Sequence, residues 1–428
     1  MTKNSIIRLT LALMLVISML LSLTSCLPGL GIGGNIFDAL FPEDDGGDGG
    51  DVTPPDNDDD NGGIIPDLGG GDDITSDNYG DLYPGSGSGD TAGLSPLSKT
   101  LLSSVSIVCD FGASGAGAGS GVIYKVDKVK GDAYIITNYH VVYMSGAGRA
   151  TNIKVYLYGM QLDSYAVSAS LVGGSVTYDI AVLKISGSEV IKNSYAMATP
   201  VASSESVRVF DRVYAVGNSE GMGMSATEGI VSVESENLEL TGADNSLVTL
   251  RVMRIDAAVN HGNSGGGLFN EDGELIGIVV AKDVSSDVDN MGYAIPSDLA
   301  VRVADNVLAH CNGSSSTRVT KPLLGVTITS YVSGLEVSPD GSEIYQVNLV
   351  EVVEISSSSL ASGKVEVGDI INSISIDGKT YRVSRVHHVT DAMLEARDGS
   401  VVVLNITRDG KTMEVSFRIK ASDFSIVN

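Results

Sequence analysis

The chain has 428 residues, which is enough for two or three domains of ordinary size. It carries 27 Lys and Arg against 53 Asp and Glu, a formal net charge of −26 at pH 7. Sixteen of these carboxylates lie in residues 27–94, which contain no Lys or Arg, so most of the acidity belongs to one segment. The charge argues against nucleic acid as a partner, because phosphate binding requires clustered cations.

The N-terminus has the pattern of a secretory signal peptide over residues 1–25. Lys3 and Arg8 precede an apolar run over residues 9–23, which at 15 residues is shorter than the ~20 that a membrane-spanning helix needs. The run ends in Leu23-Thr24-Ser25-Cys26, which resembles a bacterial lipobox and would make lipidated Cys26 the mature N-terminus. An uncleaved membrane anchor is the alternative. In both cases the two cations keep the start of the chain inside, so we expect the remainder to be extracytoplasmic and anchored to the cell membrane.

Residues 26–94 are dominated by Gly, Asp, Pro, Ser and Asn. A segment of this composition buries too little apolar surface to offset the entropy lost on ordering, and its like charges repel. We therefore expect a disordered, extended tether. Residues 56–62 partly match a calcium loop, but the glycine falls one position late and no glutamate closes the loop, so no metal site is predicted.

Residues 95–313 contain many short apolar runs separated by Gly, Asn and Ser, which is typical of an all-β sandwich or a pair of barrels. The runs cover Ser104–Val108, Gly121–Tyr124, Ala133–Thr137, Ile153–Tyr158, Ile180–Ile185, Arg212–Val216, Ile230–Val233, Leu250–Ile255 and Leu275–Ala281. A helix should follow, with Pro296 at its start, Ser297 as its N-cap and its end near His310.

Residues 314–321 are predicted to be a short polar linker, and residues 322–428 a small α+β module. In this module Asp377-Gly378 and Asp409-Gly410 predict tight hairpin turns. A helix is expected around residues 389–395.

With Cys26 lipidated, two cysteines remain. Cys109 lies in the first predicted strand and Cys311 just after the predicted helix. An extracytoplasmic setting permits a disulfide, which would tie the two ends of this domain together. Two buried free thiols are the alternative, and the sequence leaves the choice open.

Three residues in the order His, Asp, Ser stand where predicted strands end or loops begin. They lie in Thr137-Asn138-Tyr139-His140-Val141-Val142, Tyr178-Asp179-Ile180-Ala181-Val182-Leu183 and Gly262-Asn263-Ser264-Gly265-Gly266-Gly267. A serine hydroxyl is a poor nucleophile at neutral pH and needs an adjacent base. We predict a serine-protease triad in which His140 is the base, Asp179 orients it and Ser264 attacks. The glycines allow a tight turn that aims the N–H groups of Gly262 and Ser264 at the developing oxyanion.

The segment Gly262-Asn263-Ser264-Gly265-Gly266 also satisfies the G-x-S-x-G elbow of α/β-hydrolases. That fold needs its histidine after the serine, where only His310, His387 and His388 stand. It also needs a helix directly after the serine, which three consecutive glycines oppose. We therefore prefer the triad of the trypsin type.

The motifs together resemble the HtrA/DegP trypsin-like serine proteases with a C-terminal PDZ domain, over about residues 98–422. The resemblance rests on the three triad segments and on Gly119-Ser120-Gly121-Val122-Ile123, Gly217-Asn218-Ser219, Thr227-Glu228-Gly229-Ile230-Val231-Ser232, Asp256-Ala257-Ala258-Val259-Asn260-His261 and Gly292-Tyr293-Ala294-Ile295-Pro296. It implies a mostly β fold, a chymotrypsin-like double β-barrel over residues 95–313 followed by an α+β PDZ domain. It also implies unfolded or damaged exported proteins as substrates. Family members are commonly trimeric, and the acidic tether leaves a homotrimer open here.

The chain departs from the family at several positions. Ser219, His261 and Gly267 stand where the family usually has proline. We expect His261 to be a loop side chain without a catalytic role. The loop over residues 282–290 is acidic rather than glycine-rich, and it should border the substrate pocket.

In the C-terminal module, Leu323-Leu324-Gly325-Val326 resembles the PDZ carboxylate-binding loop. Backbone N–H groups at Leu324, Gly325 and Val326 would bind the C-terminal carboxylate of a peptide, while the peptide adds a strand to the sheet edge. An ordinary strand start is the alternative. The chain has no P-loop, H-E-x-x-H or C-x-x-C motif, so no cofactor is expected.

These observations predict an extracytoplasmic, membrane-tethered serine endopeptidase that forms an acyl-enzyme at Ser264. The altered residues around Ser264 motivate one alternative, a catalytically idle, membrane-anchored PDZ adaptor or holdase.

Overall fold

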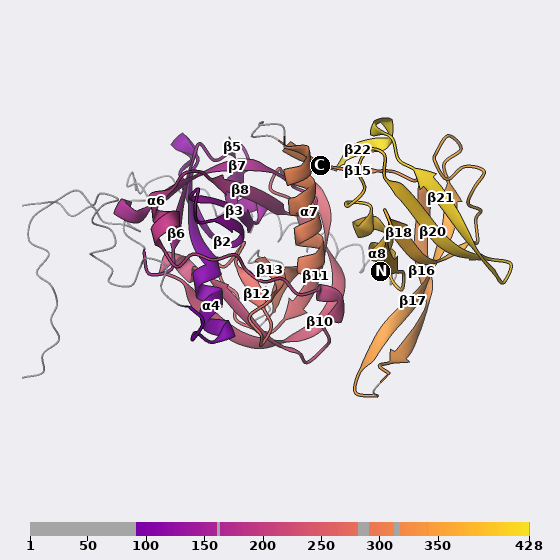
Figure 1. The fold of residues 1–428 in the computed structure, drawn as a ribbon, viewed down its shortest axis with the longest axis horizontal. Helices are drawn as coiled ribbons and strands as arrows, with labels where there is room; N and C mark the ends of the chain where they lie inside the picture. Colours follow the sequence, from indigo (N-terminus) through magenta and orange to yellow (C-terminus); the bar gives the residue numbers. More distant parts are fainter. Residues whose placement is uncertain (1–90, 161–162, 281–290, 312–316, 340, 428) are drawn as a thin grey trace, which may run out of the picture. The chain divides into compact units, whose positions relative to one another are not determined.

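The computed structural model describes residues 91–427, except residues 161–162, 281–290, 312–316 and 340. The described chain forms two β-barrels and a C-terminal α+β module (Figure 1). The predicted fold class is thereby confirmed. The predicted signal peptide, Cys26, nearly all of the tether and the acidic loop lie outside the described residues.

The first barrel consists of strands in the order β7-β6-β1-β2-β3-β8, and pairing of β7 with β8 closes it. The strands are β1 (Ser104–Asp110), β2 (Ala116–Asp127), β3 (Asp132–Thr137), β6 (Asn152–Leu157), β7 (Val167–Ser175) and β8 (Ile180–Ile185). Helix α4 (Pro96–Ser103) precedes β1, and the short helix α6 (Glu189–Asn193) follows β8. A one-turn helix, α5 (Tyr139–Val142), follows β3 and leads into the small pair β4 (Tyr143–Met144) and β5 (Gly148–Arg149).

The second barrel is closed, with strands in the order β10-β11-β14-β13-β12-β9. The strands are β9 (Arg212–Gly217), β10 (Ser225–Thr241), β11 (Leu247–Ile255), β12 (Gly267–Phe269), β13 (Leu275–Val280) and β14 (Gly292–Pro296). Every residue of β13 and β14 is buried, which explains why the apolar pattern there is continuous rather than alternating.

Helix α7 (Ser297–His310) ends where the sequence predicts, and it buries Leu299, Val303 and Val307 on one face. Its predicted N-cap is wrong. Pro296 is the N-cap residue, and Ser297 is the first helical residue. The Ser297 hydroxyl donates to the carbonyl of Ala202 at 2.8 Å, so it fastens the helix to a neighbouring segment instead of capping it.

The C-terminal module is a sheet in the order β16-β17-β18-β20-β21, with β19 paired to β18. The strands are β16 (Val326–Val337), β17 (Ile344–Ile355), β18 (Ile370–Ile376), β19 (Lys379–Arg382), β20 (Val401–Arg408) and β21 (Lys411–Arg418). Both predicted hairpin turns are confirmed, because Asp377, Gly378, Asp409 and Gly410 all have positive φ. The predicted helix begins earlier than expected, as α8 (Val386–Ala392).

The predicted linker differs from the structure. Residues 317–322 form strand β15 (Thr317–Pro322), which pairs with β7 of the first barrel and with the last strand, β22 (Phe424–Val427). Val319 is fully buried between polar neighbours, so this segment follows the alternation of a half-buried strand. Its polar composition concealed that pattern.

The two described cysteines are free, so the disulfide alternative is wrong. Cys109 is fully buried in the core of the first barrel, whereas Cys311 is exposed at the end of α7. Burial raises the pKa of the Cys109 thiol to about 12.

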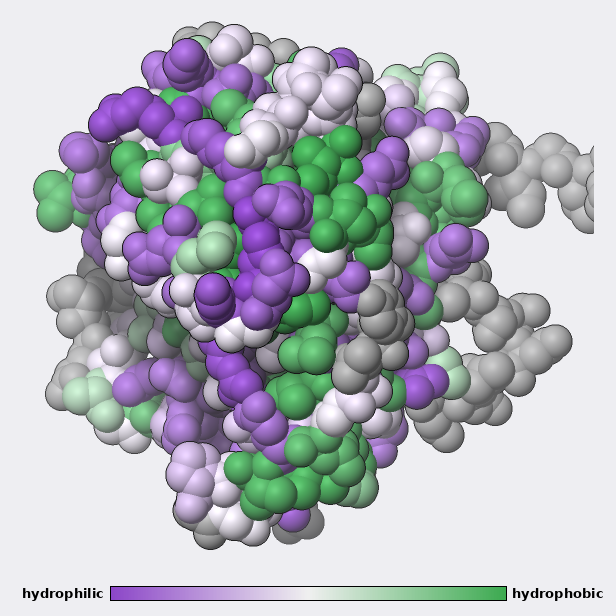
Figure 2. Space-filling view, turned by 90° about the vertical axis from the view of Figure 1, so that its right-hand side faces the viewer, coloured by the Kyte–Doolittle hydropathy of each residue, from purple (hydrophilic) through white to green (hydrophobic). Residues whose placement is uncertain are grey.

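Within the described ranges, none of the helices combines the length and the apolar character needed to cross a membrane. On the face shown in Figure 2, apolar side chains gather in separate patches between polar ones. The exposed apolar side chains of the C-terminal module include Leu335, Val337, Ile344 and Leu349, all on the β16–β17 hairpin.

The two thiols should differ sharply in reactivity. In a full-length Cys26→Ser variant without reductant, iodoacetamide should modify one cysteine, Cys311, in the folded protein and two cysteines after unfolding in urea. Burial and the raised pKa keep the Cys109 thiolate scarce in the folded state. Intact-mass analysis counts the added groups. No modification in urea without reductant would show that the cysteines are bridged after all.

Candidate active site

His140 and Asp179 are in direct contact. His140 lies on α5, immediately after β3, and Asp179 immediately precedes β8. The distance from Nδ1 of His140 to Oδ2 of Asp179 is 2.7 Å, and the His140 backbone N–H donates to Oδ1 at 3.0 Å. An ionised carboxylate only accepts, so the neutral imidazole carries its proton on Nδ1 and keeps Nε2 as an acceptor. This is the tautomer that a general base needs.

The backbone around Asp179 fixes this pair. Asp179 has φ of +48°, a left-handed conformation that aspartate tolerates better than most residues. Its carbonyl accepts from the Tyr139 N–H at 3.1 Å and from Nδ2 of Asn138 at 3.0 Å. The side chain and the carbonyl of Asp179 therefore make four hydrogen bonds to residues 138–140, one of them to the imidazole itself.

Ser264 lies on a turn before β12 that has almost no space for side chains. Gly262 and Gly265 have φ of +89° and +84°, which glycine adopts readily. A Cβ on Gly265 would lie 2.2 Å from both the Ser120 carbonyl and Oγ1 of Thr137, and 3.1 Å from the Asn138 nitrogen. A Cβ on Gly266 would lie 2.3 Å from the Val216 carbonyl. The turn therefore packs against the end of β3, three residues before His140.

Of the sequence-predicted residues, the structure joins His140 to Asp179 and brings the Ser264 turn against the segment that carries His140. His261 is exposed on its loop. Gly267 has a packing reason for departing from proline, because a Cβ there would lie 2.4 Å from ring atoms of Phe269.

Ser120 and Asn138 were assigned no role from the sequence, although both are fully buried polar residues in the quoted motifs.

The predicted peptide-binding loop precedes the edge strand β16. Gly325 has φ of +75°, and a Cβ there would lie 2.1 Å from Cβ of Ser359. The carbonyls of Leu324 and Gly325 accept from the N–H groups of Ala361 and Ser356 at 3.0 and 2.9 Å. Because a trans peptide points its N–H opposite to its carbonyl, the N–H groups of Gly325 and Val326 face away from residues 356–361.

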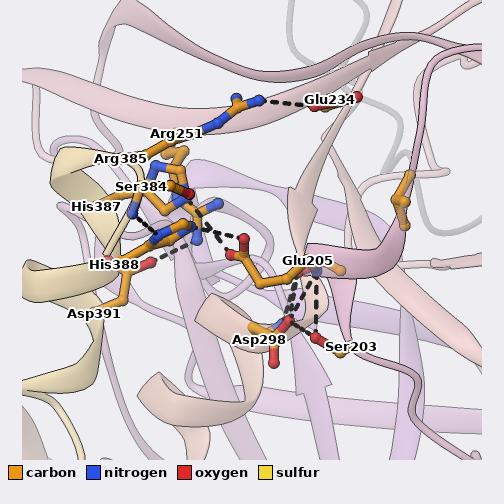
Figure 3. A network of polar contacts seen from close by, with 12 residues as sticks. Ser203, Glu205, Glu234, Arg251, Asp298, Ser384, Arg385, His387, His388 and Asp391 are labelled. Atoms are coloured by element: carbon orange, nitrogen blue, oxygen red, sulfur yellow. Dashed lines mark hydrogen bonds and ion pairs between the residues drawn. The ribbon is translucent and has the colours of Figure 1, made fainter. Parts of the chain in front are cut away.

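A cluster of possible metal ligands links η3 (Ser204–Ser206) to α8 (Figure 3). Glu205 accepts from Nε2 of His388 at 2.8 Å and lies 3.5 Å from Nε2 of His387. Burial opposes ionisation of Glu205, but hydrogen bonds from the two imidazoles outweigh it and hold its pKa well below the ordinary range. Burial lowers the pKa of His387.

The hydrogen bonds of this cluster favour protons over a metal. The Ser384 N–H donates to Nδ1 of His388 at 3.1 Å, so the neutral imidazole carries its proton on Nε2. A metal bound at Nε2 would force that proton onto Nδ1, against another donor, whereas metal-bound histidines usually donate from their second nitrogen. The cluster is therefore a carboxylate–imidazole contact, beside the buried ion pair of Arg251 and Asp391 at 2.5 Å (Figure 3).

Known proteins match this chain over both barrels and beyond. The trypsin-like peptidase domain matches residues 119–278. The serine protease Do-like HtrA of Lactococcus lactis is 34% identical over 316 residues, which cover 71% of each chain. The serine endoprotease DegS of Escherichia coli is 33% identical over 311 residues, covering 71% of this chain and 76% of DegS.

The periplasmic pH-dependent serine endoprotease DegQ of Escherichia coli is 31% identical over 317 residues, which cover 72% of this chain and 60% of DegQ. The chain thus spans less than two thirds of DegQ, but more than two thirds of the Lactococcus lactis HtrA and of DegS. With its two barrels and these relatives, the chain belongs to the HtrA family of serine proteases and is a serine endopeptidase of trypsin-like fold.

Proposed function

We propose that this endopeptidase cleaves unfolded or damaged exported proteins through a Ser264–His140–Asp179 triad, while Cys26 anchors it to the membrane outside the cytoplasm. One observation carries the mechanism. His140 contacts Asp179, and the glycine turn that carries Ser264 packs against the segment that carries His140. The signal peptide and lipobox support the location, as does the relative that is named periplasmic.

The proposed reaction has two halves. The Ser264 hydroxyl attacks the scissile carbonyl while Nε2 of His140 takes its proton, and the N–H groups of Gly262 and Ser264 bind the oxyanion. The imidazolium then protonates the leaving amine, which leaves an acyl-enzyme. Water, deprotonated by His140, attacks the ester and releases the acid, and the proton returns to Ser264. Asp179 keeps the proton of His140 on Nδ1 and stabilises the imidazolium.

The C-terminal module is proposed to bind C-terminal peptides, as PDZ domains do. The edge position of β16 supports this, because an extended peptide can pair with its free side. The outward direction of the N–H groups of Gly325 and Val326 supports binding of a carboxylate. The exposed apolar side chains on the same hairpin would add contacts to apolar peptide residues.

Replacing the nucleophile should remove activity without unfolding the protein. Ser264→Ala should lower the rate of casein cleavage by at least about 10³-fold, because no hydroxyl remains to form the acyl-enzyme. Its thermal unfolding midpoint should match the wild type, since only one oxygen is removed. A fluorophosphonate probe should label the wild type and not the variant. Wild-type cleavage by the variant would refute the triad, and a wild type that is never labelled would support the idle adaptor.

Asp179→Asn tests the orienting role. Asparagine tolerates the left-handed backbone but offers an amide where the imidazole needs an acceptor, so kcat should fall by about 10³- to 10⁴-fold. Asp377→Asn is the matched control, because Asp377 also has φ of +48° and its carboxylate also accepts a backbone N–H. The control should keep wild-type kcat. Equal losses in the two variants, measured on casein, would contradict the proposed role.

The peptide-binding loop can be tested with a fluorescent decapeptide that ends in either a free carboxylate or an amide. The acid should bind and the amide should not, as measured by fluorescence anisotropy. Gly325→Ala should weaken binding at least about 10-fold, because its methyl would collide with Ser359. Gly363→Ala, at φ of +74° but with open space around it, controls for backbone strain. Equal binding of acid and amide would rule out carboxylate recognition.

A further inference from the structure

Ser120, in the first barrel, makes two hydrogen bonds to the Ser264 turn. It lies on β2 between Gly119 and Gly121 and is fully buried. Its N–H donates to the Ser264 carbonyl at 2.8 Å, and its hydroxyl donates to the Gly262 carbonyl at 2.7 Å. The same hydroxyl accepts from the Asn218 N–H at 2.8 Å. One residue of the first barrel thus binds two carbonyls of the nucleophile turn and the N–H of the residue that follows β9 in the second barrel.

These two carbonyls flank the groups that are proposed to bind the oxyanion. The donors are the N–H groups of Gly262 and Ser264, and each shares its residue with a carbonyl that Ser120 binds. Peptide groups are planar, so binding a carbonyl fixes the plane of the following peptide. In Gly262 and in Ser264, only the φ and ψ torsions of that residue then lie between the fixed peptide plane and the donor N–H. Glycine leaves those torsions soft at Gly262, where φ is +89°.

We propose that Ser120 is a positioning residue for the oxyanion hole: its hydroxyl and its N–H keep the Gly262 and Ser264 backbone in the orientation that stabilises the transition state. The inference rests on the proposed Ser264 mechanism. It adds a residue that neither touches substrate nor belongs to the triad.

No obvious group replaces the Ser120 hydroxyl. A Cβ on Gly217 would lie 3.1 Å from Oγ of Ser120 and 2.8 Å from Oδ1 of Asn263, so the space beside the hydroxyl is already filled. Loss of the oxygen leaves the Gly262 carbonyl and the Asn218 N–H without this partner in a buried site, which favours a rotated peptide. Rotation of the Gly262–Asn263 peptide would change the φ and ψ torsions of Gly262, and the Gly262 N–H would then no longer be held toward the oxyanion.

The test compares Ser120→Ala with Ser106→Ala in the full chain. Ser106 is the direct cross-strand partner of Ser120 on β1, is equally buried, and donates to Sδ of Met224 rather than to the turn. Both variants lose one buried hydroxyl, but only one should lose oxyanion stabilisation. For a peptide ester with valine at the acyl position, Ser120→Ala should lower kcat by about 10- to 100-fold with little change in KM. Ser106→Ala should keep kcat near that of the wild type.

A thiono ester of the same peptide separates oxyanion binding from general damage. Sulfur accepts hydrogen bonds weakly, so a working oxyanion hole prefers the oxygen ester. This preference should shrink by about 10-fold in Ser120→Ala and stay unchanged in Ser106→Ala. If Ser120→Ala does not fold, Ser120→Cys fills the same site with a weaker donor and should show the same reduced preference.

An unchanged preference in a folded Ser120 variant, or equal losses of kcat in the Ser120 and Ser106 variants, would overturn the inference. Fluorophosphonate labelling of Ser264 in the wild type shows whether a failed test concerns the role of Ser120 alone or the triad as well. With labelling present, an unchanged preference removes only the role of Ser120. With labelling absent, the triad itself fails.

Discussion

The close packing of the Ser264 turn against both barrels is the constraint on which the rest of the site depends. Hypothetical Cβ atoms on Gly265, Gly266 and Gly267 would approach neighbouring atoms to 2.2, 2.3 and 2.4 Å, so a side chain at any of the three would force a neighbour to move. The neighbours come from β2 and β3 of the first barrel and from β9 and β12 of the second. The position of the nucleophile is therefore set by close contacts with the carbonyls of Ser120 and Val216 and with the buried side chains of Thr137 and Phe269.

The first barrel supplies the base, His140, and its carboxylate partner, Asp179, and hydrogen bonds to the main chain hold the two residues together. Asp179 binds the segment of Asn138, Tyr139 and His140 with its carbonyl and with both oxygens of its side chain. The contact of Gly265 with Thr137 and Asn138 joins this segment to the nucleophile turn. The two halves of the site thus share one short stretch of chain at the end of β3, and a shift there would move both.

Much of this arrangement could be predicted from the sequence, because residue types and spacing carried it. The glycines around Ser264, the order of His, Asp and Ser, and the Asp-Gly hairpin turns all encode local geometry directly. The predictions that failed depend on tertiary contacts. Ser297 has the right side chain for an N-cap, but the carbonyl of Ala202 takes its hydroxyl. Thr317–Pro322 looks like a linker until β7 and β22 supply partners on either side. The role proposed for Ser120 depends on carbonyls more than 140 residues away, which no local pattern reveals.

The most direct test of the account is a crystal structure of the protein with a peptide boronic acid, which mimics the tetrahedral intermediate. The account predicts a bond from boron to Oγ of Ser264 and one boronate oxygen within hydrogen-bonding distance of the Gly262 and Ser264 nitrogens. It further predicts that Nε2 of His140 contacts the bound adduct while Nδ1 keeps its bond to Asp179. A boronate bound elsewhere, or a Gly262 N–H turned away from the adduct, would contradict the account.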